Sequence, residues 1–253
     1  MSIAPFQIPL WIELVAAGLG GVQGALFAAT QRDRRIDLLG VIVIGLTVAL
    51  GGSVLRDILL NQPPVVVWVN WYLLVAGASA VVGMALRPLF SRADRVITAL
   101  DAIVMGLFGS IAASKALSLG VGNVGAVVVG VIGAIGGGML RDLILGRPIS
   151  ILQVGTLYAV AAGAGASALI LLVEFDVSIP LAGLVGAVIT TLVRLAAVIF
   201  GWTFPEQGVL LPRKRGVGQP PRGTVVRDVS TATTAPSTTS DRNTEPRTSV
   251  AQW

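Results

Sequence analysis

Two stretches of this chain repeat each other: GGSVLRDILLNQPP at 51–64 and GGGMLRDLILGRPI at 136–149. Each opens on a run of small residues, continues into an Arg-Asp pair and ends near proline, and the offset is 136 − 51 = 85 residues. Glu13 and Asp101, earlier in the two halves, are 101 − 13 = 88 residues apart, as are Gly18 and Gly106. A connecting loop three residues shorter in the second copy accounts for the difference. The sequence therefore predicts an internal duplication.

The composition around the repeats is that of a membrane protein. Of the 253 residues, 54% are hydrophobic and 12% charged, and the mean hydropathy is +0.84, whereas a soluble domain carries roughly 25% charged residues. A spanning helix needs about 20 mostly apolar residues. The pattern predicts an all-α polytopic protein with seven such helices, at about 9–29, 37–60, 70–90, 96–118, 121–145, 155–174 and 178–201.

Each copy of the repeat holds three predicted helices, about 9–90 for the first and 96–174 for the second. Because three is odd, the second copy enters the membrane from the opposite face, so the repeats are inverted. The helix at 178–201 stands outside them, and it completes a membrane domain over 1–203. Residues 204–253 are rich in Thr, Ser, Pro and charge, a composition that predicts a disordered tail.

Arginines fall in alternate loops, which predicts the orientation. The loops after the first, third and fifth helices carry Arg32, Arg34, Arg35, Arg87, Arg92, Arg95 and Arg147. By the positive-inside rule, the N-terminus lies outside and the tail is cytoplasmic, in the inner membrane of the cell. These arginines lie between apolar runs and form no stripe, so the lipid bilayer and not nucleic acid is the expected partner.

The chain contains no Cys and no His. Thiolate chemistry, zinc sites built from Cys or His, haem with such an axial ligand and a Ser-His-Asp triad are therefore excluded. We expect no catalytic residue, no metal site and no cofactor, and hence a protein that is not an enzyme.

The glycines of the repeated motif, Gly51 and Gly52 in the first copy and Gly136, Gly137 and Gly138 in the second, allow two interpretations. They predict a break in the helix that lines a polar path, because irregular backbone survives in a membrane only where protein or water satisfies it. Equally, small residues allow helices to pack closely.

The charges that follow, Arg56 and Asp57 with Arg141 and Asp142, favour a pore or gate over a structural clamp. A charge at mid-membrane costs about 2.5–3.5 kcal/mol on insertion scales. Each arginine is expected to reach back over its glycines to backbone carbonyls. Neighbours at i and i+1 point in different directions, so each Arg-Asp pair is not expected to be a salt bridge within the helix.

Other ionisable residues lie in or near the predicted helices. Glu13 and Asp101 are candidates for a pore mouth, or ordinary acids that favour the helix dipole. Lys115 is either a snorkelling side chain or a gating cation. Arg194 is deep enough to need a carbonyl or an acid as partner.

The doubled GGxxxRD block, together with DLLGVIVIGLTVALGGSVLRDILL, ALDAIVMGLFGSIAASKAL and LVRLAAVIFGWTFP, resembles the prokaryotic trimeric intracellular cation channels, which are also grouped under a glycine-transporter domain. The resemblance covers about residues 10–205. It implies a homotrimer with one pore in each protomer, kinked second and fifth helices, and passive conduction of monovalent cations, mainly potassium. Its motif positions here are Gly51, Gly52, Arg56, Asp57, Lys115, Gly136, Gly137, Gly138, Arg141 and Asp142.

This sequence departs from the family at two positions. Ser53 replaces the third glycine of the first motif, where it adds a hydroxyl to the path or stiffens the bend, and Glu13 stands where Asp is usual.

Three functions remain open at this point. The first is the cation channel. The second is a secondary transporter for glycine or another small amino acid, in which Arg56 or Arg141 holds the carboxylate and an Asp the ammonium. The third is a non-conducting scaffold that packs through glycine.

Overall fold

The computed structural model describes residues 8–31, 36–86, 93–150 and 157–202, with the side chains of the third range described from 95 onward. The predicted tail over 204–253 lies outside these residues and stays a prediction. The described helices are α1 (Leu10–Ala29), α2 (Leu38–Leu59), α3 (Val65–Trp68), α4 (Asn70–Leu86), α5 (Ala93–Ser118), α6 (Asn123–Ile144), α7 (Tyr158–Glu174) and α8 (Ile179–Ile199).

All seven predicted spans correspond to helices, and the short α3 is an addition. Five helices (α1, α2, α5, α6 and α8) are long and apolar enough to cross a membrane. The other two, α4 and α7, have 17 described residues each, the lower end of the range for a span. The prediction of an all-helical polytopic membrane protein is confirmed.

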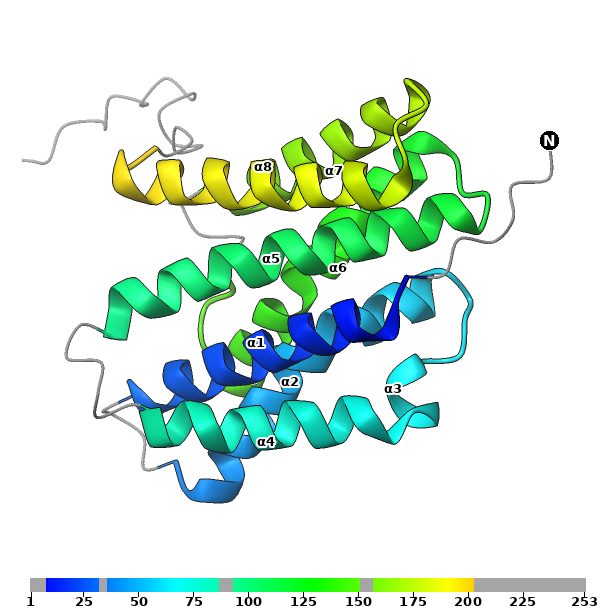
Figure 1. Ribbon diagram of the computed structural model, residues 1–253. Helices are drawn as coiled ribbons and strands as arrows, with labels where there is room; N and C mark the ends of the chain where they lie inside the picture. Colours follow the sequence, from blue (N-terminus) through cyan, green and yellow to red (C-terminus); the bar gives the residue numbers. More distant parts are fainter. Residues whose placement is uncertain (1–7, 32–35, 87–92, 151–156, 203–253) are drawn as a thin grey trace, which may run out of the picture. The chain divides into compact units, whose positions relative to one another are not determined.

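The two inverted repeats are α1, α2 and α4, and α5, α6 and α7. Figure 1 shows α1 and α5, which are in contact, running in opposite directions. The repeats meet where α2 packs on α6, and α8 packs against both α5 and α7. The predicted inversion, with one helix outside it, is therefore confirmed.

The copies end their middle helices in the same way. After α2, Asn61 has a left-handed backbone with φ 52°, and after α6 the equivalent Gly146 (61 + 85) has φ 54°. In each turn an amide returns to a carbonyl of the helix: Gln62 donates to Asp57 O and Arg147 to Asp142 O, both at 2.8 Å. Gly and Asn tolerate this conformation best. The turns fold the chain back toward the Asp of each motif.

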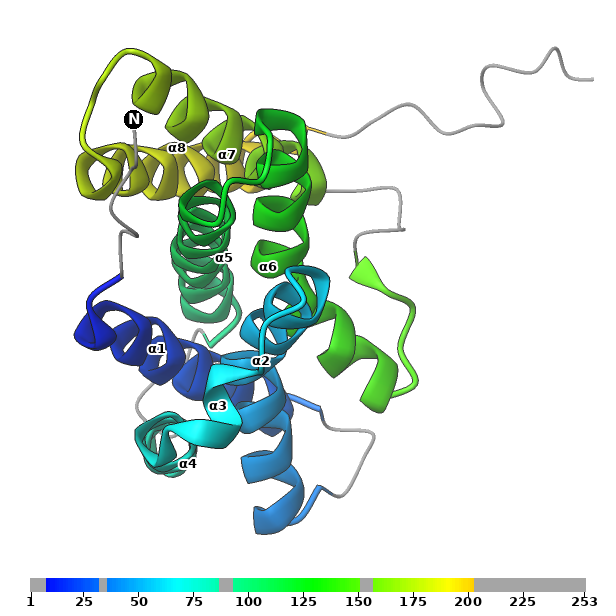
Figure 2. The same ribbon diagram turned by 90° about the vertical axis from the view of Figure 1, so that its right-hand side faces the viewer.

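The predicted break at the glycines is wrong. Both α2 and α6 are assigned as continuous α-helix through Gly51, Gly52 and 136–138. Figure 2 shows α6 changing direction along its length, so this helix bends without unwinding. A continuous helix keeps its backbone hydrogen bonds satisfied within the helix, which is the least costly arrangement in lipid.

Candidate functional site

The glycines of the two motifs bring the backbones of α2 and α6 together. A Cβ atom on Gly52 would lie 2.2 Å from the carbonyl oxygen of Gly133, and one on Gly137 would lie 2.4 Å from that of Val48. These contacts are symmetric, because Gly52 and Val48 become Gly137 and Gly133 when 85 is added. The close-packing interpretation therefore accounts for these glycines, and the helix crossing lies on the pseudo-two-fold axis.

The first charged cluster forms around Arg56 near the end of α2. Its guanidinium is buried, with Nη1 3.2 Å from Oε1 of Glu13 on α1. The hydroxyl of Tyr72 on α4 donates to the other carboxylate oxygen of Glu13. Glu13 thus ties together all three helices of the first repeat. It is buried and paired, and its place at a pore mouth stays a prediction.

Asp57, fully buried beside Arg56, receives bonds from three directions. Its Oδ1 accepts from Arg56 Nε at 2.7 Å and from Lys115 Nζ at 2.8 Å. Its Oδ2 accepts from the backbone N–H of Val65 at 3.0 Å, just beyond the left-handed turn. Lys115 belongs to α5 of the second repeat, so this ion pair crosses between the repeats. Lys115 does not simply snorkel toward water.

The Arg-Asp neighbours form ion pairs, contrary to the prediction from helix geometry. Arg56 and Asp57 are joined at 2.7 Å, and Arg141 Nη2 lies 2.8 Å from Asp142 Oδ1. The Cβ atoms of adjacent residues do diverge, but the long arginine stem curls far enough around the helix to reach the next carboxylate. Among the described residues, carboxylates and not the expected backbone carbonyls hold both guanidinium groups.

The second Arg-Asp pair has different surroundings. Asp142 accepts at Oδ1 from Arg141 Nε at 3.0 Å, and at Oδ2 from the backbone N–H and the hydroxyl of Ser150 at 3.0 and 2.7 Å. The backbone bond repeats that of Val65, because 65 + 85 = 150. Arg141 also stacks over the ring of Phe27 on α1, 3.8 Å from the guanidinium carbon to the centroid.

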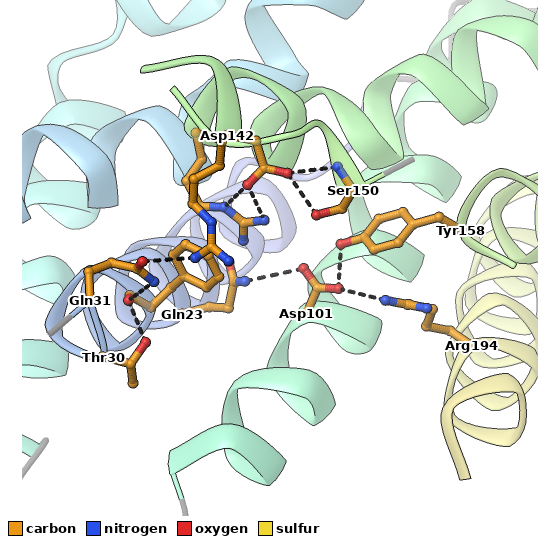
Figure 3. A network of polar contacts seen from close by, with 11 residues as sticks. Gln23, Thr30, Gln31, Asp101, Asp142, Ser150, Tyr158 and Arg194 are labelled. Atoms are coloured by element: carbon orange, nitrogen blue, oxygen red, sulfur yellow. Dashed lines mark hydrogen bonds and ion pairs between the residues drawn. The ribbon is translucent and has the colours of Figure 1, made fainter. Parts of the chain in front are cut away.

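A separate node forms around Asp101 (Figure 3). Its carboxylate accepts from Gln23 Nε2 on α1 at 3.2 Å and from the hydroxyl of Tyr158 on α7. Arg194 on α8 lies 3.7 Å away as an ion pair and covers the Tyr158 ring at 4.1 Å. Of the two partners expected for Arg194, a carbonyl or an acid, the structure shows the acid, Asp101. Asp101 is thus held among four helices.

Two small cavities lie between these groups. One borders Gln23, Asp101, Gly137 and Gly138, and the other borders Gly138, Arg141, Asp142 and Ser150; Tyr158 borders both. Each has a volume of about 10 Å³, room for about one water molecule. The described residues contain no group of three acidic, Cys or His side chains able to hold a metal ion.

Sequence reasoning missed the tyrosines, although a signal was present. Tyr72 and Tyr158 are the two tyrosines of the chain and lie 158 − 72 = 86 residues apart, close to the repeat offset. Each donates to the acid near the start of its own repeat. Gln23 and Ser150 carried no comparable signal, because neither has a polar counterpart at the repeat offset.

Comparison with known proteins identifies the family. The family model described as "Glycine transporter" matches residues 10–88 and again 98–174, which are the two repeats. A membrane protein of the UPF0126 group from Deinococcus radiodurans is 33% identical and covers 81% of this chain and 91% of its own length. The UPF0126 inner membrane protein YadS of Escherichia coli strain K12 is also 33% identical, over 74% of this chain and 90% of its own.

Solved structures of similar fold are described as channels, in line with the expected lack of enzymatic chemistry. A trimeric intracellular cation channel orthologue from Rhodobacter sphaeroides has 30% identity and a TM-score of 0.70, covering 76% of this chain and 98% of its own. A second, from work on conductance through TRIC cation channels, has 28% identity and a TM-score of 0.69, over 78% and 96%. The chain therefore belongs to the family of prokaryotic trimeric intracellular cation channels, which is also grouped under the glycine transporter domain.

Proposed function

We propose that this chain is a passive channel for monovalent cations, potassium foremost, with a conduction path inside each protomer between α2 and α6. The observation that carries the proposal is the glycine crossing with a buried Arg-Asp pair beyond it on each side. Charges are costly inside a membrane unless they serve a hydrated path or one another. Relatives described as cation channels share this fold.

The third position of each motif supports a path along the helix face that carries the polar groups. A Cβ on Gly138 would make ordinary van der Waals contacts, with Tyr158 Oη at 3.7 Å and Arg141 Nη2 at 3.8 Å. Gly138 therefore faces the polar groups while Gly137 faces α2. The equivalent Ser53 (138 − 85), buried in α2, would place its hydroxyl along the path in the first half.

The described arrangement corresponds in this proposal to a shut channel. The two cavities beside Gly138 hold about one water each and do not form a continuous route. Asp57 is neutralised by Arg56 and Lys115. Conduction requires these contacts to separate, which would expose carboxylate and backbone oxygens of the kind that replace a cation's hydration shell. The proposed pore and gate positions are Gly51, Gly52, Ser53, Arg56, Asp57, Lys115, Gly136, Gly137, Gly138, Arg141 and Asp142, with Glu13 and Asp101 as flanking acids.

We also propose that the chain assembles as a homotrimer and inserts with its N-terminus outside and its tail in the cytoplasm. The Rhodobacter sphaeroides relative is described as trimeric. Native mass spectrometry of the purified protein should give three times the 26.0 kDa chain mass. Because the chain has no Cys, single cysteines introduced at 58–64 and at 146–150 can be labelled from either side. Labelling of both from the same side would contradict the inverted topology.

The decisive test is flux through the purified protein in liposomes. We expect fast potassium efflux and unitary currents in planar bilayers, with no dependence on a glycine gradient. Asp142→Asn should reduce the flux several-fold, because it removes a carboxylate of the path. Asp37→Asn is the matched control, since Asp37 caps the exposed start of α2 and asparagine caps equally well. Saturable glycine counterflow without unitary current would contradict the channel and favour the transporter.

A further inference from the structure

One pair of equivalent positions in the repeats carries different residue types. The offset of 88 that relates Glu13 to Asp101 also relates Phe27 on α1 to Lys115 on α5 (27 + 88 = 115). The structure places both in the same way: each contacts the Arg-Asp pair of the other repeat. Their equivalence is therefore spatial as well as sequential.

The two residues contact different members of the pair. Lys115 places its ammonium 2.8 Å from the Asp57 carboxylate, whereas the Phe27 ring takes the Arg141 guanidinium against its face at 3.8 Å. Among the described residues, Oδ1 of Asp57 is consequently shared between two cations, while Oδ1 of Asp142 accepts from one cation, Arg141.

The two contacts also differ in mobility. Lys115 is a point charge on a flexible stem, and its side chain is 21% exposed. Arg141 is almost fully buried and is held by two hydrogen bonds to one carboxylate oxygen of Asp142 and by the Phe27 ring. A cation that passes Asp57 meets a displaceable ammonium, whereas one that passes Asp142 meets an aromatic ring at the same position.

We propose that the Phe27–Lys115 exchange makes the two halves of the path unequal, so that cation current is larger in one direction than in the other. Lys115 places its electrostatic barrier on one side of the glycine crossing, directly against a carboxylate. On the other side Phe27 carries no charge, and the further cation near its ring, Arg147, is exposed, lies 5.2 Å from the ring centroid and bonds to Gln31. A unit charge about 6 Å from the path, in a water-like dielectric, changes a cation's local occupancy about threefold. The inference rests on the proposed channel function and specifies which residues set its asymmetry.

The chain's lack of cysteine makes the charge at each position adjustable. In the variants Phe27→Cys and Lys115→Cys, 2-aminoethyl methanethiosulfonate attaches an ethylammonium group that imitates lysine, and methyl methanethiosulfonate attaches an uncharged group. Reagent is added to one side of a planar bilayer at a time, and the ratio of currents at opposite voltages is recorded before and after. Leu119→Cys, an exposed position one turn beyond Lys115, is the matched control.

We expect the ammonium to shift the current ratio about threefold or more at both positions, in opposite senses and with reaction from opposite sides. The uncharged reagent and the Leu119→Cys control should leave the ratio unchanged. Persistent current with no shift, or shifts in the same sense, would overturn this inference while leaving the channel intact. Absence of cation current in the unmodified protein would instead overturn the proposed function, and the asymmetry with it. The conservative variants Lys115→Arg and Phe27→Tyr test whether either position tolerates replacement. Each should elute as a single species in size-exclusion chromatography.

Discussion

Each of the two repeats buries an Arg-Asp pair at the end of its middle helix, but the partners that surround the pair differ. In the first repeat, Arg56 is shared between Asp57 and Glu13. In the second, Asp142 is the one acidic partner of Arg141 among the described residues, and Asp101 pairs instead with Arg194 on α8. Each cluster still balances two acids with two bases, because Lys115 of α5 completes the first and Arg194 of α8 completes the second. The comparison teaches that the backbone geometry of the duplication is strict, whereas the source of each compensating charge is free to change.

The largest effect should come from the element that the repeats share. Gly52→Ala and Gly137→Ala each place a Cβ within 2.4 Å of a carbonyl oxygen across the crossing, so α2 and α6 must separate. Because backbone cannot give way as a flexible side chain does, we expect about 3 kcal/mol or more of destabilisation in both copies. Thermal unfolding in detergent measures it.

Gly138→Ala is the matched control for this comparison, because it lies one residue away and its Cβ would make only ordinary contacts at 3.7 and 3.8 Å, so it should be nearly neutral. Equal unfolding temperatures for Gly137→Ala and Gly138→Ala would contradict the close crossing.

The second-largest effect is a difference between the repeats in the stability lost when the motif arginine is replaced. Arg56→Met leaves both Glu13 and Asp57 short of a partner, whereas Arg141→Met affects Asp142 alone, whose other oxygen keeps Ser150. Breaking a buried ion pair costs about 3–5 kcal/mol, so Arg56→Met should be the more destabilising of the two. The measurement is the same thermal unfolding, with the double variant Arg56→Met/Glu13→Gln expected to recover part of the loss. A larger loss of stability for Arg141→Met than for Arg56→Met would contradict the greater dependence of the first repeat on its arginine.

A smaller difference is expected at the tyrosines. Tyr72→Phe removes the hydroxyl that donates to Oε2 of Glu13, while Tyr158→Phe leaves Asp101 with Gln23 and Arg194. A hydrogen bond to a charged group contributes about 1.5–3 kcal/mol. We expect the loss of stability in Tyr72→Phe to lie toward the upper end of this range. Unfolding temperatures of the two variants check which loses more stability. A Tyr72→Phe variant clearly more stable than Tyr158→Phe would show that Glu13 relies on Arg56 alone.

The smallest effect should come from Ser150→Ala. It removes the hydroxyl bond to Asp142 but keeps the backbone bond, which makes the second site resemble Val65 in the first. We expect Ser150→Ala to be destabilised by about 1 kcal/mol or less, because the carboxylate oxygen retains one donor. Thermal unfolding measures it. Ser150→Pro, which also removes the N–H, is the contrasting variant and should cost clearly more in the same assay.

The sequence was sufficient for the helices and the inversion, because apolar length and the repeat offset are strong signals; the pore and gate roles of the motif residues stay a prediction. It was insufficient for the partners. Whether Arg56 bonds to Asp57 depends on side-chain rotamers and not on spacing, and the contact of Lys115 with Asp57 joins residues 58 apart in different repeats. The glycines illustrate the same limit: a close crossing and a broken helix require the same residue type.

The contact between Lys115 and Asp57 also has a consequence for biosynthesis. When the ribosome has delivered α1, α2 and α4 to the bilayer, Glu13 and Asp57 face Arg56 alone, so the nascent triplet carries an uncompensated negative charge. The balancing ammonium arrives only with α5. Final burial of the first half therefore has to wait for translation of the second, and the halves mature together although each resembles a complete unit.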